Sequence, residues 1–324
     1  MCALFGWLDY KHIIPHNFLK KLTQALANAA EERGMDAAGI SYIRDGKVVI
    51  FKRPKPAHKI RFNAPDNTTA IMGHTRLTTQ GNQKFNQNNH PFPGHADKEF
   101  AFAHNGVLYN DVELRKEKSL PDTHIETDSY IAVQLIEQQK KLDFNSLKNM
   151  AETVQGNFTF TVLDEDNSLY IIKGSNPICL LHFEMLGLYV YASTESIMKN
   201  ALMKVNMLSF PYTRIETTHG DIIRIDNLGN ISRSEFENKE DFRYTTWLRY
   251  FSDDFDDDYY TQHEQLLLEI CNCYGIDEED VMMLLDYGYS ADEIEDMLCD
   301  YSLITDTVRA VKGKEEYEDF LCEI

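Results

Sequence analysis

The chain begins Met1-Cys-Ala-Leu-Phe-Gly-Trp7, and the interpretation of the rest depends on this stretch. A cysteine directly after the initiator methionine can become the first residue, because its small side chain permits removal of the methionine. It then carries a thiol, with an ordinary pKa of about 8.5, beside an α-amine with a pKa of about 7.7–8.0. The amine can take the thiol proton near neutral pH and so activate the sulfur. The alternative is that Cys2 is a small apolar residue that packs at the start of a buried strand.

The composition is that of a globular chain with a large core. Of its 324 residues, 43% are hydrophobic, and the length favours about two domains. No apolar run is long enough to cross a membrane, and the N-terminus lacks the layout of a signal peptide. The six cysteines show no paired spacing. We therefore expect reduced thiols, a cytoplasmic location, no metal and no cofactor.

The net charge of −20 is distributed unevenly along the chain. Residues 1–240 hold 27 Lys and Arg against 28 Asp and Glu, which leaves 5 (32 − 27) against 24 (52 − 28) for residues 241–324. This change predicts a domain over 2–240, an acidic linker over 241–260 and a small acidic helical module over 261–324. The acidic tail repels phosphate backbones, so we expect no nucleic-acid partner.

Hydrophobic periodicity and turn residues predict alternating strands and helices in the first domain. Apolar positions at helical spacing follow Pro15, and Gly34 is expected to end that helix. The expected strands are 2–8, 38–43, 47–52, 69–75, 100–104, 158–163, 169–172, 180–183, 188–192, 221–225 and 231–234. The expected helices are 15–33, 111–117, 127–140, 144–154 and 194–203, with further helices near 261–274, 278–287 and 291–299. Ser290-Ala-Asp-Glu293 is a capping box for the last of these. This order predicts an α+β domain with stacked sheets.

Four short motifs in the first half carry residues suited to chemistry. They are Arg33-Gly-Met-Asp-Ala-Ala-Gly39, Gly73-His-Thr-Arg-Leu-Thr-Thr-Gln-Gly81, His104-Asn-Gly106 and Glu126-Thr-Asp128. Each alone has an ordinary explanation as a turn, a surface charge or a helix start. Cys2 and the four motifs together, in this order and at these separations, are specific.

The set resembles the class II glutamine amidotransferases, a family with an N-terminal nucleophile, and is most similar to the glutaminase domain of glucosamine-6-phosphate synthase. The resemblance covers roughly residues 2–235 and includes Asn88-Asn-His-Pro91 and Gln155-Gly-Asn-Phe158. It implies a four-layer αββα sandwich of the Ntn-hydrolase type, to which the acidic helical extension is attached.

The resemblance also implies roles for the site residues, with L-glutamine as substrate. Cys2 is the nucleophile, and Asn105 and Gly106 stabilise the oxyanion. Arg76 holds the substrate carboxylate, which a guanidinium grips at both oxygens, and Asp128 accepts from the substrate ammonium. Thr79 lines the glutamine pocket, and Arg33 and Asp36 order the loops near the nucleophile. His74 and His104 are expected to be packed, hydrogen-bonded histidines rather than partners of the cysteine.

Three positions depart from the family pattern. Ala3 stands where the family usually has glycine, and Leu77 and Gln80 replace an aromatic residue and a histidine. Nothing after residue 240 resembles a domain that would use ammonia. The tail segment Val281-Met-Met-Leu-Leu-Asp-Tyr-Gly-Tyr-Ser290 has the look of ubiquitin-associated-type three-helix modules. Two interpretations stay open for this module: a helical cap on the first domain, or a docking site for a partner such as an ammonia-accepting synthase.

Three functions are compatible with the motifs. The first is a glutaminase that forms a γ-glutamyl thioester on Cys2 and passes ammonia to a separate acceptor protein. The second is a hydrolase of larger γ-glutamyl amides or peptides. The third is a scaffold that binds glutamine without cleaving it, which retention of Met1 would favour.

Overall fold

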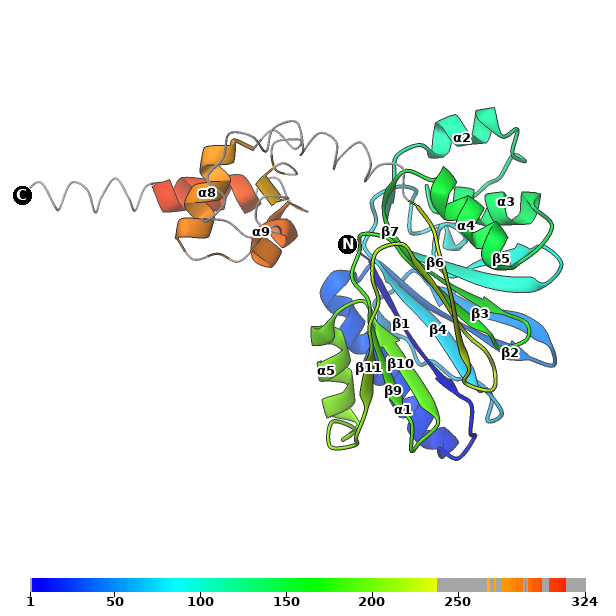
Figure 1. The fold of residues 1–324 in the computed structure, drawn as a ribbon. Coiled ribbons are helices and arrows are strands. Elements are labelled where there is room, and N and C mark those ends of the chain that lie inside the picture. The colour runs from blue at the N-terminus through cyan, green and yellow to red at the C-terminus, as the bar shows by residue number, and fades with distance from the viewer. Residues whose placement is uncertain are drawn as a thin grey trace, which may run out of the picture. The chain divides into compact units, whose positions relative to one another are not determined.

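The computed structural model describes residues 2–237, 267–268, 271, 276–287, 289, 291–298 and 303–312. The chain divides into two compact units, Met1–Arg243 and Tyr244–Ile324. Two predicted segments lie largely outside the described residues. They are the linker over 241–260 and the helix over 261–274, of which only residues 267, 268 and 271 are described. Figure 1 shows the fold of the described part.

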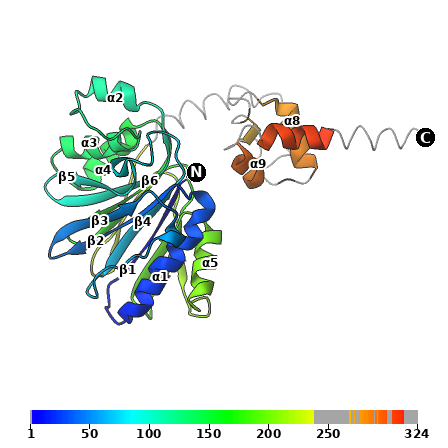
Figure 2. The same ribbon diagram turned by 180° about the vertical axis from the view of Figure 1, so that it is seen from behind.

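Two antiparallel sheets form the centre of the first unit (Figures 1 and 2). The first sheet has the order β11-β9-β10-β1-β4-β2-β3 and the second β13-β12-β8-β7-β6-β5. The strands of the first sheet are β1 (Ala3–Asp9), β2 (Ala37–Arg44), β3 (Lys47–Arg53), β4 (Ala70–Arg76), β9 (Cys179–Phe183), β10 (Leu188–Ala192) and β11 (Thr213–Ile215). Those of the second are β5 (Phe92–His95), β6 (Glu99–Leu108), β7 (Gly156–Asp164), β8 (Leu169–Lys173), β12 (Asp221–Ile225) and β13 (Ile231–Glu235).

Helices cover the outer face of each sheet. The first sheet carries α1 (His16–Ala29) and α5 (Glu195–Lys204), and the second carries α3 (Tyr130–Gln138) and α4 (Phe144–Thr153), with α2 (Asp111–Glu117) beside α3. Short 3-10 turns lie at η1 (Ala30–Arg33), η2 (Ala57–Lys59) and η3 (Asn86–Asn88). The order helix, sheet, sheet, helix confirms the expected αββα sandwich.

The central strand β1 is buried on both faces, by the second sheet on one side and by helices on the other. Leu4 and Leu8 point into the core between the two sheets, whereas Phe5 and Trp7 point to the helices on the outer face. Side chains of a strand alternate between faces, so a strand buried on both sides is apolar throughout. Trp7 also donates its indole N–H to the Thr23 hydroxyl of α1 at 2.8 Å, which satisfies the only polar atom of its side chain.

Two features of the local structure differ from the prediction. The strand expected over 100–104 continues through Asn105 and Gly106 to Leu108, because its ladder with β7 is unbroken up to that residue. The strands β5 and β11 were not predicted, since both are short and lack a long apolar run. Gly34 ends the helical segment as predicted, since η1 stops at Arg33, and its backbone is extended (φ 176°). A Cβ there would come within 2.4 Å of the Leu77 nitrogen, so close backbone packing is what requires glycine.

The second unit has helices and an apolar cluster of its own. Its helices include α8 (Glu278–Asp286), α9 (Ala291–Met297) and a helical stretch over 303–312. Val281, Leu284, Ile294, Ile304 and Val308 are buried in its cluster. The start of α9 agrees with the predicted capping box, although Ser290 itself lies outside the described residues.

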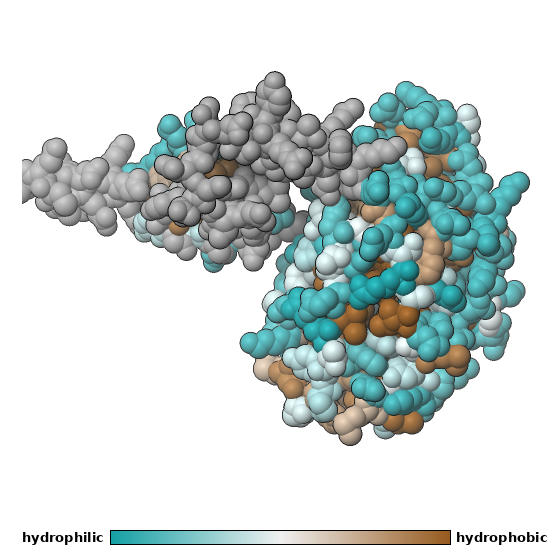
Figure 3. All heavy atoms as spheres, in the orientation of Figure 1, coloured by the Kyte–Doolittle hydropathy of each residue, from teal (hydrophilic) through white to brown (hydrophobic). Residues whose placement is uncertain are grey.

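Polar residues cover most of the surface of the first unit in the view of Figure 3, with apolar side chains exposed in smaller groups. Among the described residues, no helix has the length and apolar character needed to span a bilayer.

Candidate active site

Strand ends from both sheets meet at one edge of the first unit and form the candidate site. Cys2 directly precedes β1, and Arg76 is the last residue of β4, which pairs with β1 so that Ala3 lies opposite Thr75. Gly106 lies near the end of β6 in the other sheet, and Asp128 shortly precedes α3. The sandwich therefore joins residues that are up to 126 positions apart in the sequence (128 − 2).

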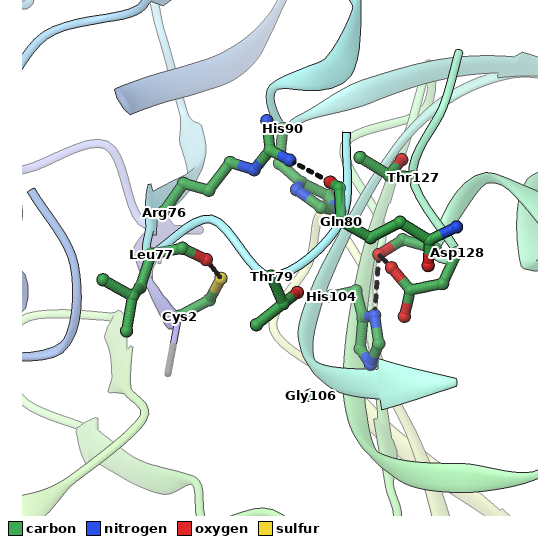
Figure 4. Close-up of a pocket in the computed structure, with 11 residues that line it drawn as sticks. Cys2, Arg76, Leu77, Thr79, Gln80, His90, His104, Gly106, Thr127 and Asp128 are labelled. Atoms are coloured by element: carbon green, nitrogen blue, oxygen red, sulfur yellow. Dashed lines mark hydrogen bonds between the residues drawn. The ribbon is translucent and has the colours of Figure 1, made fainter. Parts of the chain in front are cut away.

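A cavity of about 240 Å³, which includes the space at its mouth, lies between these strand ends (Figure 4). Five of the eight predicted site residues line it: Cys2, Arg76, Thr79, Gly106 and Asp128. The other lining residues are Leu77, Gln80, His90, His104, Thr127 and Ser129. Arg33, Asp36 and Asn105 do not line the cavity.

The Cys2 thiol faces a loop carbonyl at the wall of this cavity. Its sulfur lies 3.4 Å from the Leu77 carbonyl oxygen, to which the thiol donates. Removal of the thiol from water raises its pKa, and the positive charge of Arg76 opposes that rise. The sulfur is therefore held as a thiol rather than a thiolate, and it needs a base before it can attack.

Arg76 is buried and already engaged on several sides. One terminal nitrogen, Nη1, donates to the Asn89 side-chain oxygen at 2.7 Å. The other, Nη2, donates to the carbonyls of Gln80 and Gly81. A guanidinium has five N–H donors, so these three bonds leave two for a ligand.

Arg33 and Asp36 act on the backbone near the nucleophile. Arg33 donates from Nε to the Cys2 carbonyl at 3.1 Å. The Asp36 carboxylate accepts from the Thr78 amide at 2.8 Å, and the Asp36 amide donates to the Arg76 carbonyl at 2.9 Å. These contacts agree with the expected loop-ordering role and give neither residue a place on the cavity wall.

Asn105 and Gly106 lie within the ladder between β6 and β7. Gly106 has a φ of +142°, and a Cβ there would come within 1.9 Å of the Asn157 carbonyl oxygen, so no other residue fits. The Asn105 carboxamide is fully buried beside the cavity. Its Nδ2 donates to the Ser193 hydroxyl at 3.4 Å, and its main-chain carbonyl accepts from the Asn176 side chain at 2.9 Å.

Asp128 is held as a buried acceptor just before α3. Its Oδ2 accepts from the Leu108 amide at 2.6 Å, and its Oδ1 accepts from the Ser129 hydroxyl at 3.3 Å. A carboxylate near a helix N-terminus also gains from the helix dipole. The Leu108 amide links Asp128 to the end of β6, two residues beyond Gly106.

Three buried histidines lie together at the site, and two of them, His90 and His104, line the cavity. The His74 ring lies 4.2 Å from that of His90, and its Nε2 pairs with the His104 carbonyl at 2.9 Å. His104 Nδ1 pairs with the Ser129 hydroxyl at 2.8 Å. Burial lowers the pKa of His74 to about 3 and also lowers those of His90 and His104, so all three are neutral at pH 7. They are packed and hydrogen-bonded, as we predicted for His74 and His104.

Lys52 supports the segment that carries Asn89 and His90. Its Nζ donates to the Asn89 carbonyl and, at 2.9 Å, to the Pro91 carbonyl, and it lies 4.9 Å from the centre of the Phe92 ring. Burial, together with the charge of Arg76, lowers the Lys52 pKa to about 7. Lys52 was not predicted as part of the site, because in the sequence it is one basic residue of an ordinary strand.

Several other residues at the site were also not assigned from the sequence. His90 stands in the Asn88-Asn-His-Pro91 motif, so the motif itself was a usable signal. Thr127, Ser129 and Ser193 gave none, because serine and threonine are common at helix starts and strand ends. Among the described residues, no group of three or more His, Cys, Asp or Glu side chains is arranged to hold a metal ion.

A protein-family model described as a glutamine amidotransferase domain matches residues 74–199, the span from β4 to α5 that includes Arg76, Gly106 and Asp128. The first unit is a class II glutamine amidotransferase domain.

Curated relatives of this amidotransferase domain include larger enzymes. A glutamine–fructose-6-phosphate aminotransferase (isomerizing) of Bacillus thuringiensis is 32% identical over 190 residues, which cover 55% of this chain and 30% of that protein. A 7-cyano-7-deazaguanine synthase 2 of Sulfurisphaera tokodaii is 27% identical over 235 residues, covering 69% of this chain and 50% of that protein. The chain thus matches between about a third and a half of the length of these relatives.

A solved structure shares the fold of the class II amidotransferase domain. The glutamine phosphoribosylpyrophosphate amidotransferase of B. subtilis, complexed with ADP and GMP, has a TM-score of 0.56 at 19% identity, covering 73% of this chain and 49% of that one. This likeness supports the Ntn-type sandwich.

Proposed function

We propose that this chain hydrolyses L-glutamine to glutamate and ammonia through a γ-glutamyl thioester on Cys2, and that the ammonia passes to a separate acceptor protein. The observation that carries the proposal is the cavity itself. It brings the Cys2 thiol, the Arg76 guanidinium and the Asp128 carboxylate together at one small site. These are the three groups that a thiol-dependent cleavage of a free amino acid requires.

Substrate binding would use the charged groups on opposite sides of the cavity. The α-carboxylate of glutamine would replace the Gln80 and Gly81 carbonyls at Arg76 Nη2 and receive charge-assisted hydrogen bonds. The α-ammonium would donate to Asp128, whose second oxygen stays bound to the Leu108 amide. Thr79 lies on the wall between them. The side-chain amide would then extend toward the sulfur.

The chemical steps follow from the state of the thiol. After removal of Met1, the α-amine of Cys2 takes the thiol proton, and the sulfur attacks the amide carbon. The carbonyl oxygen becomes an oxyanion, stabilised by the Gly106 N–H and the Asn105 carboxamide, a contact worth about 3–4 kcal/mol per donor. The α-amine returns the proton to the departing nitrogen, so ammonia leaves. Water then attacks the thioester and releases glutamate.

We propose that the ammonia acceptor is a separate protein. We propose that the acidic second unit is the site at which it docks, since clusters of negative charge favour association with a basic surface. The relatives that share the domain are named as an aminotransferase and a synthase, which supports a transfer role.

Incubation of the purified chain with glutamine tests the proposal. We expect glutamate and ammonia in equal amounts, a mature mass that lacks one methionine, and one covalent adduct on Cys2 with the glutamine analogue 6-diazo-5-oxo-norleucine. Cys2→Ala should abolish turnover, whereas the control Cys179→Ala, at a buried cysteine of β9, should retain it. Faster turnover of γ-glutamyl conjugates than of glutamine would support the larger-substrate alternative. A retained Met1 with no turnover would support the binding scaffold.

A further inference from the structure

Ser193 joins the nucleophile strand to the strand that carries the oxyanion carboxamide. It follows β10 directly and is fully buried. Its hydroxyl oxygen accepts from the Leu4 amide at 2.8 Å, and its own amide donates to the Leu4 carbonyl at 2.9 Å. Leu4 lies two residues after Cys2. The position of the Ser193 hydroxyl is therefore set by the same strand that positions the nucleophile.

The same hydroxyl contacts the side chain of Asn105 across the gap between the two sheets. Asn105 Nδ2 lies 3.4 Å from Ser193 Oγ, which is at the long end of the range for a hydrogen bond. The Asn105 Oδ1 atom is buried and has no hydrogen-bond partner among the described residues. The backbone of Asn105 is fixed independently, because the Asn176 side chain donates to its carbonyl and Asn176 is in turn held by the Thr159 hydroxyl at 2.6 Å.

The two ends of a carboxamide differ in hydrogen-bonding character but hardly in shape. A half-turn about the Cβ–Cγ bond of Asn105 exchanges Oδ1 and Nδ2 while the backbone stays in place. A serine hydroxyl can accept from the Leu4 amide and still donate its own hydrogen. After the half-turn, Ser193 donates to Oδ1, so the unpartnered oxygen gains a donor and both N–H groups are released.

We infer that Ser193 is a positioning residue whose hydroxyl holds Asn105 Oδ1 and thereby directs the carboxamide NH₂ to the oxyanion formed at Cys2. This inference rests on the proposed function, because it assigns a partner to the oxyanion donor of that reaction. Ser193 does not touch substrate. Because Ser193 is bonded to the strand that follows Cys2, it holds the Asn105 carboxamide at a constant distance and orientation from the Cys2 sulfur.

Ser193→Ala tests the inference through the split between kcat and KM. We expect kcat for glutamine to fall by about 10- to 100-fold, the range seen when a supporting hydrogen bond is removed, with KM unchanged. Ser41→Ala is the matched control, since Ser41 is also a fully buried serine of the first sheet but bonds to the Met72 carbonyl. It should leave both constants unchanged. Similar melting temperatures for the two variants would exclude a loss of folding as the cause.

Binding of glutamate γ-semialdehyde gives a readout that does not depend on turnover. The Cys2 sulfur adds to the aldehyde carbon, and the carbonyl oxygen becomes the tetrahedral oxygen that Asn105 would contact. Ser193→Ala should weaken this inhibitor by the same factor by which kcat falls. Equal inhibition of wild type and variant would overturn the inference.

A double-mutant cycle separates the inference from the proposed function. Once Asn105→Ala has removed the carboxamide, Ser193→Ala should change kcat by less than about twofold, because coupled residues are not additive. A further independent fall would show that Ser193 acts in another way. A large effect of Asn105→Ala with none of Ser193→Ala would overturn the inference and leave the proposed function standing. Absence of glutamine hydrolysis by the wild type would end both.

Discussion

The two sheets contribute to the cavity in different ways. At the edge of the first sheet, Cys2 and Arg76 bond to carbonyls of a loop, those of Leu77, Gln80 and Gly81, which a ligand can replace. At the edge of the second sheet, Asn105 and Gly106 stand inside a continuous ladder with β7. In the proposed reaction, the first edge holds the groups that react or exchange partners, and the second holds the oxyanion donors on a backbone that is fixed by the ladder.

This difference indicates where reorganisation is tolerated during the reaction. Displacement of the loop carbonyls by a substrate carboxylate costs little free energy, because one set of hydrogen bonds replaces another. Oxyanion donors must already be in place when charge develops, because reorganisation at that moment would raise the barrier. We therefore expect activity to depend most on backbone conformation at the second edge. At the first edge it should depend most on the shape and hydrogen-bonding pattern of the charged side chain.

The largest expected effect is at the rigid edge. Gly106→Ala should reduce kcat by at least about 100-fold, as expected for a displaced oxyanion donor. It should also destabilise the first unit by several kcal/mol, because the new Cβ meets the Asn157 carbonyl and φ is +142°. Steady-state kinetics and denaturant unfolding measure the two effects. Gly46→Ala is the control: its φ is also positive, at +69°, but a Cβ there has open space, so activity should persist.

A smaller effect is expected at the exchangeable edge. Arg76→Lys keeps the charge but loses the planar fork, so we expect KM for glutamine to rise about 10- to 100-fold, equivalent to about 1.4–2.8 kcal/mol. The value of kcat should change by only a few-fold, since the reacting atoms are untouched. Arg53→Lys on β3, which is exposed, should leave KM unaltered. A fall in kcat with constant KM would contradict the division between the two edges.

The third effect concerns stability rather than turnover, and it arises from the neutral histidines at the site. Their pKa values are lowered in the folded chain, to about 3 for His74, whereas unfolded histidine titrates near 6.5. Below pH 6.5 the unfolded state binds more protons, so their contribution to stability is complete above about pH 6.5 and is lost as pH falls toward 3. Three such groups give a slope of up to about 4 kcal/mol per pH unit.

Denaturant unfolding of the chain between pH 4 and 8 measures this slope. His74→Gln should make this slope shallower below pH 6.5, whatever the change in overall stability, because one of the groups that are protonated in the unfolded state and neutral in the folded state is gone. An unchanged slope in His74→Gln would show that this histidine is charged, or accessible to water, in the folded state.

Much of the fold was predictable from local pattern. The limits of β12 and α2 agree with the prediction, and most other elements differ by a few residues at their ends. The predictions failed at positions where pairing with another strand determines the local backbone conformation. The residues Asn105-Gly106 are typical of a turn, and only the ladder with β7 places them inside a strand. Gly34 ends its helical segment as predicted, but the approach of Leu77 is what requires glycine there.

The sequence by itself determined the kind of chemistry: a potential N-terminal thiol nucleophile, a guanidinium, a carboxylate and an Asn-Gly pair, in an order that identifies the family. These assignments depend on residue type, which the chain states directly. Only the tertiary structure decided the partners: Ser193 beside Asn105, Lys52 beneath the Asn89 segment, and the loop carbonyls at Arg76. Such contacts join positions far apart in the chain, so local propensity cannot predict them. They exist because two apolar sheets must stack face to face, and that packing brings their polar ends together.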